Sequence, residues 1–252
     1  MVTKVKNRVS KNGHSNGSVE ELIPKRAKKS AASLPVAQDA PAKNGKEAAV
    51  TITPPRMQVV KVRIRGTAPY MQLRFPEKAR NTMIETHKAG SQAKSKKKRE
   101  ARDFDADYKQ AFHRLPNGDA GIPCASIRSA MISACRTAGF VMEQAKQAVW
   151  CLHDGLDVVD GAALVKIHGK PRQTIMPVRN SGGSTDLRVR PQWDEWHADL
   201  RIRVNLDVMS VSDAINLLAR AGMLVGIGEG RIGGTKQGYG MGLGSFEVEM
   251  CD

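Results

Sequence analysis

Two stretches of the chain alternate strictly between apolar and charged residues. In MQVVKVRIRG, Val60, Val62 and Ile64 alternate with cations, and ADLRIRVNL repeats the pattern between Leu200 and Val204. A period of two predicts a β-strand with one buried face and one face in water. The polar faces of the two predicted strands carry five cations: Lys61, Arg63, Arg65, Arg201 and Arg203. Two interpretations stay open for them, a solvated surface or a surface across which a polyanion lies.

Other stretches have the spacing of helices. Residues 76–90 begin with Pro76 and end with Gly90, which suit a first turn and a stop, and residues 142–152 look like a shorter helix. Residues 122–140 place small apolar side chains on one face before Gly139 ends the helix. That stripe comprises Ile127, Ala130, Met131, Ala134, Cys135 and Ala138. SVSDAINLLARAGML opens with a Ser/Asp cap and carries a stripe of Ala214, Ile215, Leu217 and Leu218.

The remaining patterned segments are short β-like runs. ALVKIHG, RQTIMPV and TDLRVRP are divided by Gly, Pro and NSGGS, and LGSFEVEM alternates as a closing strand. The order of these elements predicts an α+β fold, an enlarged ferredoxin-like (RRM-like) βαββαβ core. In that fold two helices cover one face of the sheet and the other face is open to a ligand. The Lys/Arg alternations point to the open face.

Composition divides the chain into a tail and a domain. Residues 1–55 have almost no apolar periodicity and hold ten Lys and Arg against four Asp and Glu, which predicts a disordered basic tail. Its PKRAKK, Pro24–Lys29, resembles a nuclear-import signal. Residues 56–252 form the predicted domain, interrupted at about 91–102 by a flexible basic insertion. The cations of this insertion that we expect to reach for phosphates are Lys96, Lys97, Lys98 and Arg99.

The charge balance points to a polyanionic partner. Forty Lys and Arg against 25 Asp and Glu give a net charge of +15. Nucleic acid is the commonest intracellular polyanion, so single-stranded RNA or single-stranded DNA is the expected partner. No apolar run is long enough to span a bilayer and no signal-peptide core begins the chain, so we expect a cytoplasmic protein without a membrane partner. Four cysteines without CxxC spacing predict buried thiols, with no metal and no cofactor.

Glycine is concentrated in one segment near the C-terminus. Ten of the 23 glycines lie between Gly222 and Gly244, although glycine loses more backbone entropy on folding than any other residue. GGTKQG lacks the Gly-Lys-Ser/Thr order of a Walker A loop and leads into a strand, which disfavours a nucleotide hydrolase. A cradle for a nucleic-acid backbone fits better. The residues expected to form it are Arg231, Lys236, Gly238, Gly240 and Gly242.

Three segments resemble the RAMP superfamily, which includes the backbone subunits and processing ribonucleases of CRISPR systems. GIPCASIRSAMISACR is similar to its "lPgsSLkgalR" segment, VGIGEGR…GYGMGLGSFEV to its glycine-rich loop, and VKVRIRGTAPYM to its opening strand. Pro123, Ser126 and Arg128 match the family pattern, while Cys124 stands where glycine is usual. The resemblance implies an RRM-like core that grips RNA by shape and backbone, with Ser126 and Arg128 among the contacts. It also implies a possible homo-oligomer or filament along the nucleic acid.

Alternative functions stay open. The family's ribonuclease branch cuts RNA with acid–base help, often from a histidine, so an endoribonuclease is the second hypothesis, with His113 or Asp119 as candidates. We expect no catalytic residue, because the histidines follow no repeated spacing. Trp193 and Trp196 favour a small local core over a wedge between bases. Only 11 of 252 residues are Phe, Trp or Tyr, so phosphate contacts should dominate. A structural or scaffolding protein is the third hypothesis.

Overall fold

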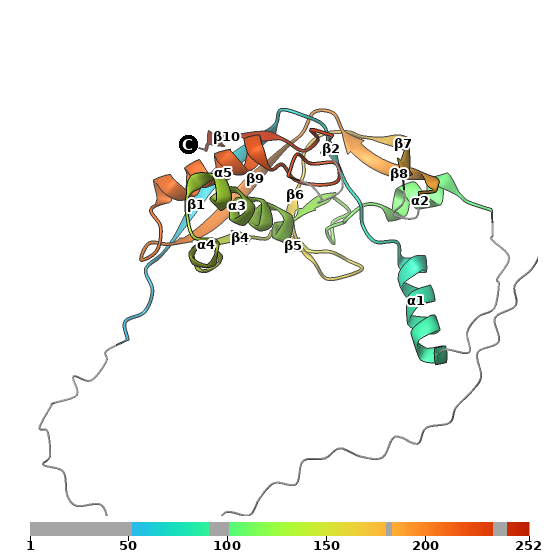
Figure 1. Cartoon of the computed structure of the whole chain (residues 1–252), viewed down its shortest axis with the longest axis horizontal. Helices are drawn as coiled ribbons and strands as arrows, with labels where there is room; N and C mark the ends of the chain where they lie inside the picture. Colours follow the sequence, from blue (N-terminus) through green and yellow to red (C-terminus); the bar gives the residue numbers. More distant parts are fainter. Residues whose placement is uncertain (1–51, 91–100, 180–182, 234–240, 252) are drawn as a thin grey trace, which may run out of the picture. The chain divides into compact units, whose positions relative to one another are not determined.

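The computed structural model describes residues 52–90, 101–179, 183–233 and 241–251, and Figure 1 shows the arrangement of their elements. Its largest sheet is antiparallel and has the strand order β10-β1-β9-β4. These strands are β1 (Met57–Gly66), β4 (Val149–Leu152), β9 (His197–Asn205) and β10 (Phe246–Met250). The fold is therefore mixed α and β, with the two strands of strict alternation side by side at the centre of the sheet.

Helices α3 (Cys124–Ala138) and α5 (Val211–Leu224) pack on one face of this sheet and against each other. The apolar positions of the two central strands are buried there, and Ile64 and Val204 are both 0% exposed. The alternating pattern thus turns one face of each strand toward the helices. Ser210 caps α5 by accepting a hydrogen bond from the Asp213 amide at 3.0 Å, as its sequence predicts. Gly139 ends α3 with a φ of 68°.

Two smaller antiparallel sheets complete the domain. One contains β2 (Tyr70–Met71), β8 (Thr185–Trp193) and β7 (Pro171–Arg179), and the other contains β3 (Gly121–Pro123), β6 (Ala163–Lys166) and β5 (Gly155–Leu156). Trp193 and Trp196 are buried and both contact Tyr70, with ring centroids 5.6 and 5.5 Å from it. This confirms the prediction of a local aromatic core and excludes a wedge made from these two rings.

The structure corrects the predicted helix over residues 142–152. The helix α4 (Met142–Ala148) stops at Ala148, and Val149 begins strand β4. Val149 is β-branched and Trp150 is aromatic, and both residue types favour a strand. Pairing with Val204 and Arg203 of β9 gives their backbone N–H and C=O groups hydrogen-bond partners. Ala138, expected in the buried stripe of α3, is exposed because it is the last residue of the helix.

Two helices lie between β2 and β3. The predicted helix over residues 76–90 is confirmed as α1 (Glu77–Ala89), but none of its residues is buried. Helix α2 (Phe104–Gln110) begins at Asp103, whose carboxylate accepts hydrogen bonds from the amides of Asp105 and Ala106 at 3.0 Å. Arg102, the last cation of the predicted insertion, forms ion pairs with Asp107 at 2.6 Å and Asp186 at 3.1 Å. The rest of the insertion and residues 1–51 lie outside the described residues.

The described helices include none that is long and apolar enough to cross a membrane. All four cysteines are free. Cys124 and Cys135 are buried, as predicted, whereas Cys151 and Cys251 are only partly buried, so the prediction of buried thiols is wrong for these two.

Candidate nucleic-acid interface

The outer face of the large sheet carries the predicted cations, but carboxylates from neighbouring strands lie among them. Arg63 Nε is 2.6 Å from Asp199 directly across on β9, and Arg65 Nε is 2.7 Å from Glu249 on β10. Each hydrogen-bonded guanidinium lowers the pKa of its carboxyl partner. Arg201 likewise contacts Asp154 at 3.2 Å. The face therefore has mixed charge, and a polyanion lying on it would compete with these carboxylates.

One side chain on this face was missed by the sequence analysis. Trp150 stands opposite Arg203, whose guanidinium lies 5.0 Å from the Trp150 ring centroid. Trp150 fell within the helix predicted over residues 142–152, although the composition of VWCL is typical of a strand. Lys61 occurs in no ion pair of the described residues.

A second surface combines α3 with the start of the glycine-rich segment, and we call it the α3 groove. Its volume is about 340 Å³, and its described lining residues include no carboxylate. The side of α3 that faces it carries three hydroxyls, at Ser126, Ser129 and Ser133, spaced to lie on one helical face. Its lining comprises Pro123, Ala125, Ser126, Ser129, Ala130, Ser133, Val225, Ile227 and Arg231.

The N-terminus of α3 opens into this groove. Pro123 is its N-cap and supplies no side-chain hydrogen bond to the first turn, while Ser126 Oγ donates to the Pro123 carbonyl at 2.7 Å. Unpaired amides at a helix start favour an anion through their partial positive charge. Arg231 lies across the groove and donates to the Gly228 carbonyl at 3.3 Å. A phosphate-sized anion would thus meet backbone amides, the hydroxyls of Ser129 and Ser133 and one guanidinium, whereas the Ser126 hydroxyl donates its proton to the Pro123 carbonyl.

Arg128, the other predicted contact on α3, has a different position. Its Nε donates to the Val149 carbonyl at 2.9 Å, and a second guanidinium nitrogen donates to the Lys146 carbonyl. It is not among the groove residues. These bonds join α3 to the end of α4 and the start of β4, so Arg128 has a structural task that family resemblance did not reveal.

In the glycine-rich segment, backbone conformation and close packing require glycine at several of the described positions. Gly226, Gly228, Gly230 and Gly244 have φ between 67° and 81°, in the left-handed region that favours glycine. A Cβ at Gly228 would lie 2.5 Å from the Met71 carbonyl oxygen, so the segment also packs closely on β2. The concentration of glycine is therefore explained in part by backbone shape and close approach.

The remaining predicted cradle residues fall at or beyond the base of the loop. Arg231 and Leu243 form a parallel bridge that closes this base beside the α3 groove. Gly242 has a φ of 75°, and no described residue lies within 4 Å of a Cβ added there. Lys236, Gly238 and Gly240 lie outside the described residues, as do Lys96, Lys97, Lys98 and Arg99.

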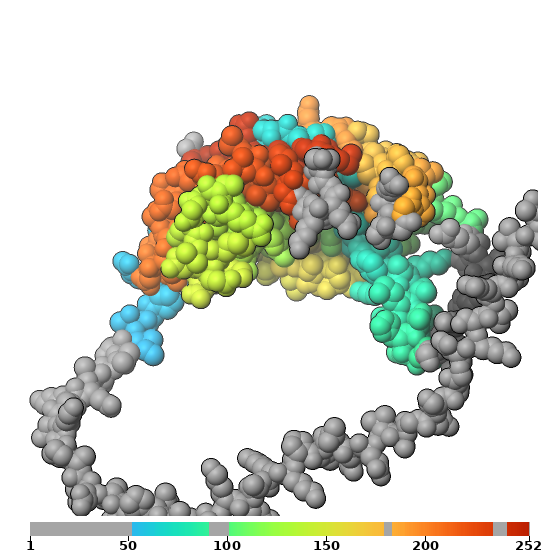
Figure 2. Space-filling model, in the orientation of Figure 1, coloured from blue at the N-terminus to red at the C-terminus, as the bar shows by residue number. Residues whose placement is uncertain are grey.

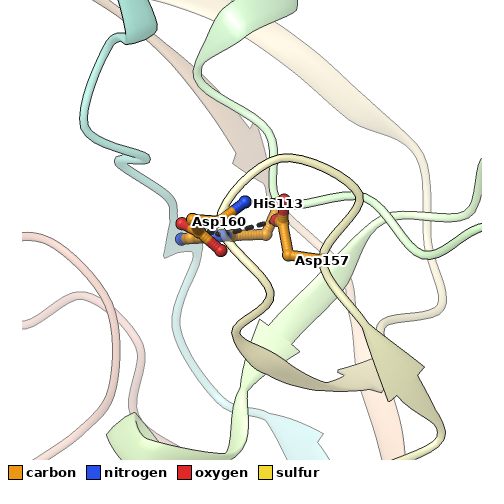
Figure 3. A group of neighbouring side chains, drawn as sticks. All are labelled: His113, Asp157 and Asp160. Atoms are coloured by element: carbon orange, nitrogen blue, oxygen red, sulfur yellow. Dashed lines mark hydrogen bonds and ion pairs between the residues drawn. The ribbon is translucent and has the colours of Figure 1, made fainter. Parts of the chain in front are cut away.

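A separate cluster brings together His113, Asp157 and Asp160 (Figure 3), whose possible ligand atoms all lie within 4.8 Å of one another. Asp157 is fully buried, and His113 Nδ1 lies 2.8 Å from its Oδ2. The same carboxylate accepts from the amides of Arg114, Val159 and Asp160 at 3.2, 2.8 and 3.4 Å. Arg74 Nη1 is 3.9 Å away. A metal ion would have to displace these donors and approach a cation, so we interpret the cluster as a structural network.

We expect Asp157→Asn to destabilise the protein by about 3 kcal/mol at pH 7. Burial by itself raises the pKa of Asp157, but the Val159 amide and His113 outweigh it and hold the pKa below its ordinary value. A lowered carboxyl pKa stabilises the fold above the unfolded-state pKa, and this stabilisation is lost as the pH falls through the folded pKa.

Urea unfolding of both proteins between pH 7 and about pH 3 measures this contribution. The difference in free energy of unfolding between wild type and Asp157→Asn should shrink toward the acid end, where Asp157 loses its stabilising charge. The other carboxylates titrate alike in both proteins, so their contributions cancel from this difference. A difference that stays constant over this range would show that ionised Asp157 contributes nothing.

Asp119, the other catalytic candidate, also takes part in an ion pair. Asp119 lies 2.7 Å from Lys166, and its hydrogen bond to the Lys166 ammonium lowers its carboxyl pKa. Nearby, the rings of His168 and His197 stack with centroids 4.6 Å apart. Burial, followed by the charges of His168 and Arg63, lowers the pKa of His197.

No protein-family model matches the chain, and no curated protein matches its sequence.

Proposed function

We propose that the protein binds single-stranded RNA or DNA through the sugar–phosphate backbone, with little sequence preference, and that the α3 groove is the principal contact. The observation that carries this proposal is a groove with three hydroxyls, a helix start and Arg231 but no carboxylate. The chain's net charge of +15 would hold a polyanion near it. The outer sheet face, with its mixed charge, would contribute less.

We also propose that the core is ferredoxin-like (RRM-like) and of the RAMP type. Two observations support this. The first strand of the large sheet, β1, lies between the last strand, β10, and β9, and the two helices α3 and α5 pack on one face. The segments that resemble the family, around Pro123 and in the glycine-rich segment, come together at the α3 groove.

An endoribonuclease is the second candidate, and one observation favours it. Asp157 orients the ring of His113 through Nδ1, as a buried carboxylate orients a general base in many hydrolases. Incubation of RNA with excess protein distinguishes the two functions. We expect bound and intact RNA; discrete products that disappear in His113→Ala would establish the nuclease instead.

Replacement of Arg231 tests the proposed binding surface. Arg231→Ala should weaken binding of a labelled single-stranded oligonucleotide and lower the salt slope by about one phosphate contact. Arg136→Ala is the matched control, since Arg136 is exposed in the last turn of α3 and lies outside the groove. Equal losses in both variants would assign the effect to overall charge and contradict the proposed site.

A further inference from the structure

Helix α1 exposes its apolar side chains. None of its 13 residues is buried, and Met83 and Ile84 are 53% and 45% exposed. Phe75, which immediately precedes the N-cap Pro76, is 58% exposed and is the most exposed aromatic side chain among the described residues. Figure 2 shows α1 at the surface, in teal. The apolar residues of an amphipathic helix ordinarily face a core, so this face is suited to a ligand.

The polar residues around these side chains are cations. Arg80, His87 and Lys88 line a hollow of about 560 Å³ together with Phe75, Met83 and Ile84, and its described lining includes no carboxylate. Neither Arg80 nor Lys88 takes part in an ion pair within the described part of the chain. The helix carries its acidic residues, Glu77 and Glu85, along a second hollow. One side of α1 therefore combines an aromatic ring, apolar side chains and two cations that have no ion-pair partner among the described residues.

We propose that this side of α1 is a stacking platform for unpaired bases of a single strand. A base would stack on Phe75 and contact Met83 and Ile84, while Arg80 and Lys88 would meet the flanking phosphates. Aromatic rings beside cations are how proteins hold single strands without reading their sequence. The charge of the hollow fits a polyanion, and the chain continues from α1 into the Lys-rich stretch at residues 94–99.

This inference rests on the proposed nucleic-acid binding and adds a second contact to the α3 groove. It assigns base stacking to α1 and phosphate contacts chiefly to the groove. It also gives a role to an aromatic side chain in a chain where such residues make up only 4%.

Substitution of Phe75 combined with abasic oligonucleotides tests the platform. Phe75→Leu keeps an apolar side chain but removes the ring, and Phe75→Tyr keeps the ring as the matched control. For an oligonucleotide with bases, Phe75→Leu should lose about tenfold in affinity, and Phe75→Tyr should stay within about twofold of wild type. For an abasic strand of equal length, wild type and Phe75→Leu should bind equally. Thermal unfolding should be unchanged in both variants, since Phe75 is exposed.

The outcomes separate this inference from the function on which it rests. Wild-type binding with no effect of Phe75→Leu would overturn the platform alone, and would leave this side of α1 to a protein partner. An equal loss on normal and abasic strands would also overturn it, because the ring would then act without a base. Failure of the wild type to bind either strand at low salt would overturn both proposals.

Discussion

Gly244→Ala should destabilise the protein by about 4 kcal/mol, a loss that only a few kinds of substitution reach. Gly244 is buried and has a φ of 67°, and a Cβ there would lie 1.8 Å from the Ile227 carbonyl oxygen. The Ile227 amide also donates to the Gly244 carbonyl at 3.0 Å. Any side chain at Gly244 would separate the segment that leads into β10 from the segment that follows α5.

Gly242→Ala is the matched control, two residues away. Its φ of 75° imposes the same left-handed strain, but no described residue lies within 4 Å of an added Cβ. We expect a loss of about 1–2 kcal/mol, the cost of a left-handed residue with a side chain. Chemical unfolding of the two variants separates backbone strain from close packing. Equal losses would contradict the close approach of Gly244 to Ile227.

Ser129→Asp should weaken binding of single-stranded nucleic acid by tenfold or more. Ser129 is exposed on α3, in the middle of the α3 groove, where a carboxylate would face the phosphates. A like charge at the proposed contact repels the ligand, and it also opposes the field of Arg231. Because Ser129 is exposed and helical, the stability of the fold should change little.

Ser212→Asp gives the same change in net charge at another place. Ser212 is exposed in the first turn of α5, outside the groove, where an acidic residue suits the helix dipole. Its affinity should stay within about twofold of wild type. Similar losses in Ser129→Asp and Ser212→Asp, measured by fluorescence anisotropy, would mean that nucleic acid contacts some other surface.

The sequence predicted the large sheet and its two covering helices because their patterns are strictly periodic. The pattern predicts one buried face for the strands around Val62 and Leu200 and for the helix around Met131. The structure confirms this, since all three side chains are buried. The edge strand β4 was missed because it is only four residues long and directly follows α4. Its pairing with β9, a tertiary contact, decides its conformation.

The candidate site could be predicted from the sequence only in part. A row of alternating cations gives no information about neighbouring strands, so the pairing of Arg63 with Asp199, 136 residues away, could not be foreseen. Family resemblance indicated Ser126, which lines the α3 groove, and also Arg128, whose guanidinium bonds to backbone carbonyls instead. Ser129 and Ser133 had no motif of their own, because their role follows from the packing of α3 beside the segment after α5.

The salt dependence of binding tests the central claim most directly. A labelled single-stranded oligonucleotide is titrated with the full chain at several salt concentrations. If the backbone is the ligand, log affinity should fall linearly with log salt, by about 0.7 for each phosphate contact, and several contacts should be counted. RNA and DNA of different sequence should give similar slopes. A flat salt response, or no binding at low salt, would contradict the account.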